Sequence, residues 1–261
     1  MFDAAVRCEG IGKRFSRDEI VPYHGLRTKI HNLFRRAGRT AEGDGILWAL
    51  RDVSFELPSG RILGVLGTNG SGKSVLLKIL ARVTKPTDGR SVVRGSVSSI
   101  LNLGAMLNPE LTGRENIYQT GTILRLRRET IARRFDEIVW FSGIESQLDS
   151  LVRGYSAGMQ LRLAFAVMAH LESDVLLIDE ALSFGDQEFR ERCVERIRRM
   201  GRAGSTIVIV SHELDMLAGL CDLVLVLEHG RVSAFGSARR IIDTYRDSFH
   251  GGEARAGQLD R

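Results

Sequence analysis

Short apolar runs recur along the chain, and each is bounded by glycine or polar residues. They are Ile62–Leu66, Val175–Ile178, Ile207–Val210 and Val224–Leu227. Such runs, rich in Val, Ile and Leu, are typical of strands buried on both faces of a parallel sheet. Helical spacing follows the first run, over residues 74–81. The pattern therefore predicts an α/β domain built on a parallel sheet.

A different pattern covers residues 111–150. Thr112 and Glu115 have the Thr-x-x-Glu spacing of a capping box, and the residues after them favour helix without a strand-like run. This pattern predicts a helical subdomain, over about residues 105–160, inserted in the α/β body. From residue 249 the chain is polar and Gly-rich, so we expect a domain over residues 1–248 and a frayed tail over 249–261.

Residues 16–47 are predicted to form an N-terminal insertion with a basic segment. A helix over residues 26–36 would carry an apolar stripe, with most of its basic side chains off that stripe. The helix either packs its stripe on the domain or faces an anionic membrane surface, where each basic residue contributes about 1 kcal/mol. The stripe is Leu26, Ile30, Leu33 and Phe34, and the basic residues are Arg27, Lys29, Arg35 and Arg36.

Composition narrows the class of protein. The chain has 261 residues, 43% hydrophobic and 26% charged, with a net charge of +5, which excludes intrinsic disorder. Its apolar runs stop well short of the ~20 residues of a spanning helix. The first residues lack the basic start and apolar core of a secretory signal, so we expect a cytosolic chain. Three scattered cysteines, Cys8, Cys193 and Cys221, favour reduced thiols over disulfides or a metal site.

The strongest chemical motif lies between the first predicted strand and the helix after it. It matches GxxxxGK[ST] in full, in the structural context that this motif requires. Its glycines let backbone N–H groups converge on phosphate oxygens, and the helix N-terminus adds a favourable dipole. Lys73 is predicted to bind the β- and γ-phosphates of a nucleotide, and Ser74 to ligate Mg²⁺. The motif comprises Gly67, Thr68, Asn69, Gly70, Ser71, Gly72, Lys73 and Ser74.

Two carboxylates, Asp179 and Glu180, follow the apolar run at 175–178. A buried parallel strand would deliver them to the same sheet edge as the phosphate-binding motif. Asp179 is then expected to hold the Mg²⁺ shell, and Glu180 to polarise the attacking water as a general base. A strand followed by Asp-Glu is a weak signal alone and a strong one beside that motif.

A third motif carries a family resemblance. The chain resembles the nucleotide-binding domains of ABC transporters, whose usual LSGGQ signature is retained here at Ser156 and Gly158. The resemblance implies that this helix start binds the γ-phosphate of an ATP held by a second subunit. It also implies an α/β P-loop fold with a helical subdomain and a small antiparallel β region, a homodimer with two composite sites, and a separate membrane permease. The signature residues are Tyr155, Ser156, Ala157, Gly158 and Met159.

Other positions are similar to further elements of that family. Asp186 ends a segment similar to the D-loop, and His212 follows a predicted strand as the family's switch histidine does. Asn102 stands near the place of the glutamine that links the phosphate-binding motif to the membrane partner, where it is expected to reach Mg²⁺ through water. For adenine stacking the resemblance implies Phe15, with Trp48 as the alternative.

Finer similarity concerns a subgroup of the family. The segments at 103–116, 155–171 and 178–186 look like those of ATPases that export O-antigen, capsular or teichoic-type polysaccharides. This implies an ATPase at the cytoplasmic face of the bacterial plasma membrane, driving a permease that itself binds most of the lipid-linked polysaccharide, with no nucleic-acid partner. The alternatives are a soluble ABC ATPase acting on nucleic acid or ribosomes, and an ABC ATPase for another exported substrate.

Overall fold

The computed structural model describes residues 4–16, 46–100, 106–179 and 186–256, with side chains described up to residue 247. The basic insertion at 17–45, Asn102 and Glu180 lie outside these ranges, as does most of the segment similar to the D-loop. The roles proposed for them stay predictions.

A six-stranded sheet forms the centre of the molecule, in the order β5-β6-β7-β3-β8-β9. All neighbouring strands pair in parallel except β8 and β9. The four predicted strands are confirmed as β3, β6, β7 and β8. The edge strands β5 and β9 were not predicted, since neither has a continuous apolar run. The bounds are β3 Ile62–Leu66, β5 Val97–Ile100, β6 Val175–Asp179, β7 Thr206–Val210, β8 Leu223–Glu228 and β9 Arg231–Ser237.

A second, antiparallel sheet packs against one face of the first. Its order is β2-β1-β4, formed by β1 (Ala4–Ser16), β2 (Ile46–Pro58) and β4 (Asp88–Val93). Helix α2 (Lys73–Leu80) lies between the two sheets and shares one apolar cluster with both, which includes Val6, Leu77 and Leu177. The small antiparallel β region implied by the resemblance is therefore present.

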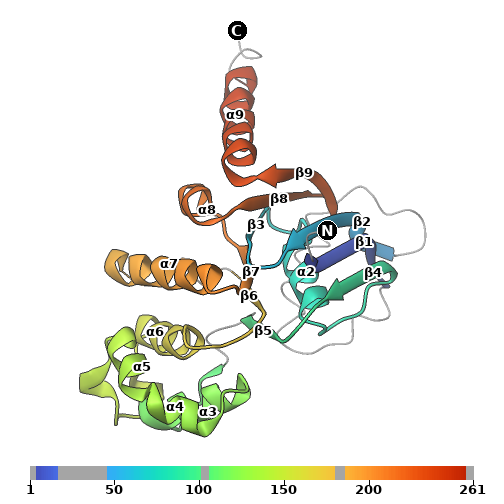
Figure 1. Cartoon of the computed structure of the whole chain (residues 1–261). Coiled ribbons are helices and arrows are strands. Elements are labelled where there is room, and N and C mark those ends of the chain that lie inside the picture. The colour runs from blue at the N-terminus through green and yellow to red at the C-terminus, as the bar shows by residue number, and fades with distance from the viewer. Residues whose placement is uncertain (1–3, 17–45, 101–105, 180–185, 257–261) are drawn as a thin grey trace.

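Helices cover the other face of the central sheet, and several of them form a separate layer below it in Figure 1. Phe141 and Phe165 stack with ring centroids 6.0 Å apart, and both rings pack on Phe189. These aromatic contacts join the helical subdomain to α7. The helices are α3 Gly113–Ile123, α4 Arg128–Arg133, α5 Phe135–Ser142, α6 Ala157–Met168, α7 Gln187–Arg202 and α8 Leu214–Leu220, with short 3₁₀ turns at Glu145–Gln147 and Val152–Gly154.

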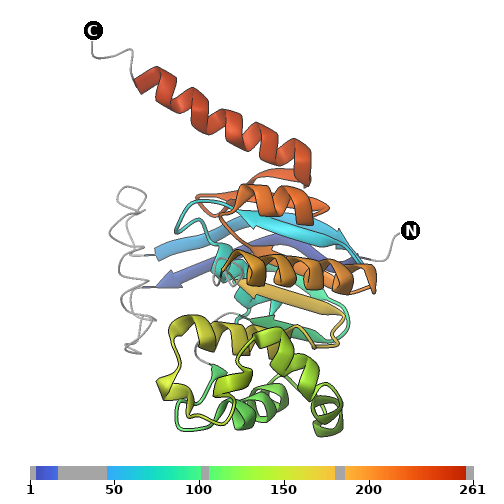
Figure 2. The same ribbon diagram turned by 90° about the vertical axis from the view of Figure 1, so that its left-hand side faces the viewer.

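Helix α9 (Ala238–Ala256) is the last described element, and it extends away from the sheets (Figure 2). Its first turns pack through buried Ile242, and Arg246 forms an ion pair with Asp215 of α8. The backbone is helical up to Ala256, past residue 249, where we expected a frayed tail to begin.

Among the described residues, no helix combines the length and the apolar character needed to span a bilayer. All three cysteines are buried and unpaired, as predicted. Burial raises the pKa of the Cys8 and Cys221 thiols to about 12, so these thiols are unreactive at neutral pH.

The predicted capping box at the start of α3 is confirmed, and removing it should lower the stability of the fold. Thr112 Oγ1 accepts from the Glu115 N–H at 3.2 Å, and Glu115 Oε2 accepts from the Thr112 N–H at 2.8 Å. We expect Thr112→Ala to lower the free energy of unfolding by about 1 kcal/mol, a typical cost of losing an N-cap. Urea unfolding measures it. Thr122→Ala is the control, because its hydroxyl only bonds back to the Tyr118 carbonyl of the same helix. Equal losses in the two variants would contradict the capping role.

Candidate nucleotide-binding site

The phosphate loop, defined as residues 67–74, connects the end of β3 to the start of α2. Lys73 is buried, and its Nζ donates to the carbonyl oxygens of Gly67 at 2.7 Å and Thr68 at 3.0 Å. The ammonium group is therefore held inside the loop. Helix α2 starts behind Gly72 without a side-chain cap or an acidic residue in its first turn. The positive end of its dipole is thus not neutralised by its own first turn.

Two glycines let the loop pass close to neighbouring backbone. Gly67 has a φ of +145° and Gly72 of +105°, a region that other residues rarely adopt. A Cβ on Gly72 would lie 2.5 Å from the Ala49 carbonyl oxygen, and one on Gly67 would overlap the Leu227 carbonyl oxygen. The ends of β2 and β8 therefore determine the path of the loop.

The polar side chains of the loop fall into two groups. Thr68, Asn69 and Ser74 are exposed. The Ser71 hydroxyl is buried and has no hydrogen-bond partner within the described residues. A buried hydroxyl without a partner is unfavourable, so it marks a position where the loop gains from an added acceptor or donor.

Residues with predicted roles in nucleotide chemistry lie at one edge of the central sheet. Strand β7 lies between β6 and β3, with Asp179 of β6 paired to Val210, which is also paired to Val65 of β3. Because all three strands are parallel, the residues that follow them emerge at the same edge. The predicted shared edge of Asp179 and the phosphate loop is confirmed. Asp179 is half-buried there.

His212 reaches the same edge from the central one of these strands. It is exposed and lies two residues beyond the end of β7. The preceding Ser211 is buried, and its Oγ accepts from the Glu213 N–H at 3.1 Å. This short-range bond shapes the turn that carries His212.

The signature residues lie in the helical subdomain, at the start of α6. Ser156 caps the helix, with its Oγ accepting from the Met159 N–H at 3.2 Å. Tyr155 is buried and donates to the Gln147 carbonyl at 2.6 Å, which anchors the turn. Ser156 and Ala157 are exposed, and a Cβ on Gly158 would meet only the Ser156 hydroxyl within 4 Å. The helix start is therefore open to an approaching molecule.

Asp186 links this helix to the next one. Its Oδ1 caps α7 by accepting from the Phe189 N–H at 2.9 Å, and its other oxygen forms an ion pair with Arg162 of α6. The Phe189 N–H, and after it the charge of Arg162, hold the pKa of Asp186 below its usual range. Arg162 also lies over the Phe189 ring, 5.5 Å from its centroid. Sequence reasoning missed Arg162, whose partner is 24 residues away.

The two candidates for adenine stacking lie on adjacent strands. Phe15 of β1 pairs with Leu47, and the preceding Arg14 pairs with Trp48. Since consecutive residues of a strand point to opposite faces, Phe15 and Trp48 lie on opposite faces of this hairpin. Lys13 Nζ lies 5.2 Å from the Phe15 centroid, whereas Arg14 and Arg51 lie 5.8 and 5.4 Å from that of Trp48. The preference for Phe15 stays a prediction.

A glycine-rich loop between a buried strand and a helix, beside a strand that ends in a carboxylate, defines a P-loop nucleotide-binding protein. The family profile described as ABC transporter matches residues 50–183. The chain belongs to the ABC transporter family, as an ATP-binding, ATP-hydrolysing component.

Individual relatives and solved structures agree with this membership. The chain is similar to the O-antigen export system ATP-binding protein RfbB of Klebsiella pneumoniae, at 40% identity over 87% of this chain and 93% of that one. It is also similar to the teichoic acids export ATP-binding protein TagH of Listeria monocytogenes, at 36% identity over 85% and 65%. The fold matches a dimeric ATP-binding cassette bound to ADP and Pi, with a TM-score of 0.70, 20% identity, and coverage of 90% and 99%.

Adding a Cβ at Gly67 tests whether the close approach of neighbouring backbone determines the path of the phosphate loop. We expect Gly67→Ala to weaken ATP binding about 5- to 150-fold, because overpacking of roughly 1–3 kcal/mol would displace the loop. Titration with a fluorescent ATP analogue measures the affinity, and circular dichroism checks that the fold is kept. Gly219→Ala in α8 is the matched control, since the nearest atom to its new Cβ would lie 3.7 Å away. Unchanged affinity in Gly67→Ala would contradict this account of the loop.

Proposed function

We propose that the chain is the ATPase subunit of an ABC exporter that moves a lipid-linked polysaccharide through a separate transmembrane subunit. The observation that carries the proposal is the convergence of the phosphate loop, Asp179 and His212 on one sheet edge, while the signature residues stay exposed on another subdomain. The substrate class is supported by the O-antigen and teichoic acid export proteins among its relatives.

Magnesium is the metal that this edge would hold. Ser74 and Asp179 offer a hydroxyl and a carboxylate oxygen, the hard ligands that Mg²⁺ prefers. Within the described ranges, no group of three or more His, Cys, Asp or Glu residues could hold a metal ion alone. That arrangement fits Mg²⁺, which usually takes one or two protein ligands together with waters and substrate phosphates. When bound, the ion would neutralise charge on the β- and γ-phosphates, with Asn102 proposed to reach it through water.

The chain's own residues would then carry the hydrolysis. Lys73 and the loop N–H groups bind the phosphates, and His212 contacts the γ-phosphate from the central strand. Glu180, the residue after Asp179 in the sequence, is proposed to accept a proton from the attacking water. The buried Ser71 hydroxyl gains a partner when the phosphates fill the loop.

The exposed signature supports a head-to-tail homodimer. Ser156 and Ala157 face solvent, so their helix start is available to an ATP bound on a second copy. Two ATP molecules would close the dimer, and hydrolysis would reopen it, which converts chemical energy into motion of the permease. We place this assembly at the cytoplasmic face of the plasma membrane, with Asp186 at the dimer interface.

Replacing the proposed general base tests the chemistry. We expect Glu180→Gln to bind ATP normally and to slow hydrolysis by about 10²–10⁴, the usual contribution of a general base. Size-exclusion chromatography with ATP and Mg²⁺ should then show a stable dimer. Lys73→Ala is the comparison, because it should lose ATP binding as well as turnover. Near-normal turnover of Glu180→Gln would remove Glu180 from this role.

Mixing two inactive variants tests the composite site. Ser156→Arg and Lys73→Ala should each be inactive alone, whereas their mixture can form one working site per heterodimer. That site combines Lys73 and Glu180 of one chain with Ser156 of the other. Steady-state ATPase assays should therefore show partial recovery on mixing. A Ser156→Arg chain with full activity alone would contradict a signature that acts on the second subunit's ATP.

The export function is tested in the cell that makes the protein. A chromosomal Lys73→Ala allele, expressed at the normal level, should abolish one surface polysaccharide and leave its lipid-linked precursor inside. Affinity purification of the tagged wild-type chain from detergent-solubilised membranes should recover a polytopic membrane protein. An unchanged set of surface polysaccharides would contradict the substrate class, even where ATP hydrolysis is confirmed.

A further inference from the structure

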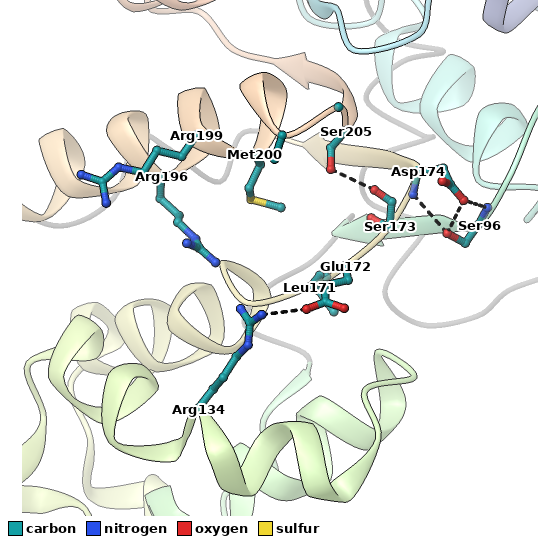
Figure 3. A pocket seen from close by; sticks show the side chains of 12 residues that line it. Ser96, Arg134, Leu171, Glu172, Ser173, Asp174, Arg196, Arg199, Met200 and Ser205 are labelled. Carbon is teal, nitrogen blue, oxygen red and sulfur yellow. Dashed lines mark hydrogen bonds and ion pairs between the residues drawn. The ribbon is translucent and has the colours of Figure 1, made fainter.

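A pocket of about 620 Å³ lies at the edge of the central sheet opposite the phosphate loop (Figure 3). It is lined by the connection from α6 to β6, by the last turns of α7 and by the connection from α7 to β7, with Arg134 directly before α5 and Ser96 directly before β5. None of the residues assigned to nucleotide chemistry above belongs to it. We call it the arginine pocket.

More basic than acidic side chains line the arginine pocket. Arg134, Arg196 and Arg199 line it, together with the carboxylates of Glu172 and Asp174. Both carboxylates are engaged, since Glu172 accepts from Arg134 at 2.7 Å and Asp174 accepts from the Ser96 N–H at 2.7 Å and the Ser96 hydroxyl at 2.8 Å. Outside the lining, Glu195 pairs with Arg199 at 3.1 Å, and Glu137 lies 3.5 Å from His170.

Among the described residues, Arg196 has no carboxylate within ion-pair distance, although the charge of the nearby Glu137 acts on it. It is half-buried, and its Nε donates to the Ala169 carbonyl at 2.5 Å. In the part of the chain that the structure describes, its two Nη nitrogens have no hydrogen-bond or ion-pair partner. Burial, and after it the charge of Arg134, lower the pKa of Arg196. A half-buried guanidinium of this kind gains strongly from an anion.

The interaction of Arg196 with the C-terminal end of α6 accounts for only one part of its side chain, the Nε group. A cation beside the last carbonyls of a helix is favourable, and the Nε contact to Ala169 supplies that contribution. This interaction with the helix end does not require the two Nη groups of Arg196, a residue that lines the pocket. Ser173, which also lines the pocket, is 7% exposed, and its Oγ has no partner within the described residues. Among the residues that the structure describes, the lining therefore holds one buried hydroxyl without a partner, that of Ser173, and the two Nη nitrogens of Arg196, which have no protein partner.

We propose that the arginine pocket binds a small soluble ligand through an oxyanion group, a phosphate or a carboxylate. The Nη pair of Arg196 provides the planar fork that grips two oxygens of such a group. The volume of the pocket falls in the range of small-molecule sites, which favours a small ligand over a macromolecule. The pocket lies at the C-terminal ends of α6 and α7, the helices that begin at Ser156 and Asp186, so the attraction for an anion comes from the arginines and not from the helix dipoles.

Calorimetric titration with inorganic pyrophosphate, and separately with citrate, tests this site at constant ionic strength and without Mg²⁺. All titrations use the full chain carrying Lys73→Ala, which weakens the competing phosphate loop. We expect Arg196→Met to weaken binding of whichever anion binds by at least about tenfold. Arg198→Met is the matched control, with an expected change below twofold. Arg198 lies on the same helix, and its Nη2 also donates to a carbonyl, that of Gly219 at 3.1 Å.

A third variant separates recognition from folding. Arg196→Lys keeps a cation near the Ala169 carbonyl and removes the paired Nη groups, so it should fold normally and still bind more weakly by about threefold or more. Binding of pyrophosphate alone assigns the pocket to phosphates, and binding of citrate alone assigns it to carboxylates. Absence of binding by both anions at millimolar concentration would overturn the proposal. Equal weakening in Arg196→Met and Arg198→Met would overturn it too, because it would indicate non-specific charge attraction.

Discussion

The parallel pairing of β7 with both β3 and β6 is the constraint on which the rest of the structure depends. Asp179, Val210 and Val65 lie level across these strands, so the segments after them emerge together at one edge. The phosphate loop is then confined by the Leu227 carbonyl of β8 in the same sheet and by the Ala49 carbonyl of β2 in the second sheet, which crowd Gly67 and Gly72. A shift of one residue in either pairing would move the carboxylate relative to the loop and turn its side chain to the other face.

Helices α6 and α7 run from the signature and from Asp186 to the opposite side of the molecule. Helix α6 begins at the exposed Ser156, and α7 begins at Asp186, which the Arg162 side chain ties back to α6. The rings of Phe141 and Phe165 stack, and Phe189 of α7 packs edge-on against both, which gives the two helices an aromatic contact. Their far ends meet at the arginine pocket, about 18–24 Å away for helices of 12 and 16 residues at 1.5 Å per residue.

The central strands and the phosphate loop could be predicted from the sequence, because buried parallel strands and GxxxxGK[ST] leave dense local signals. The edge strands could not. β9 alternates between exposed and half-buried residues, and β5 contains Ser98 and Ser99 in place of an apolar run. Contacts between residues far apart in the sequence could not be predicted either. The contact of Arg162 with Asp186, and that of Arg196 with the Ala169 carbonyl, join residues 24 and 27 positions apart, which no local pattern encodes. The signature itself was found through family resemblance rather than through physics alone.

The central claim is that the exposed start of α6 completes the nucleotide site of a second copy. Cross-linking measures this directly, because the native cysteines are all buried and leave introduced, exposed cysteines as the reactive ones. One chain would carry Asn69→Cys in the phosphate loop and the other Ala157→Cys, both at exposed positions. With a short bifunctional reagent, the account predicts a heterodimeric cross-link that forms with ATP and is largely absent without it. No cross-link, or one of equal yield without ATP, would contradict the composite site.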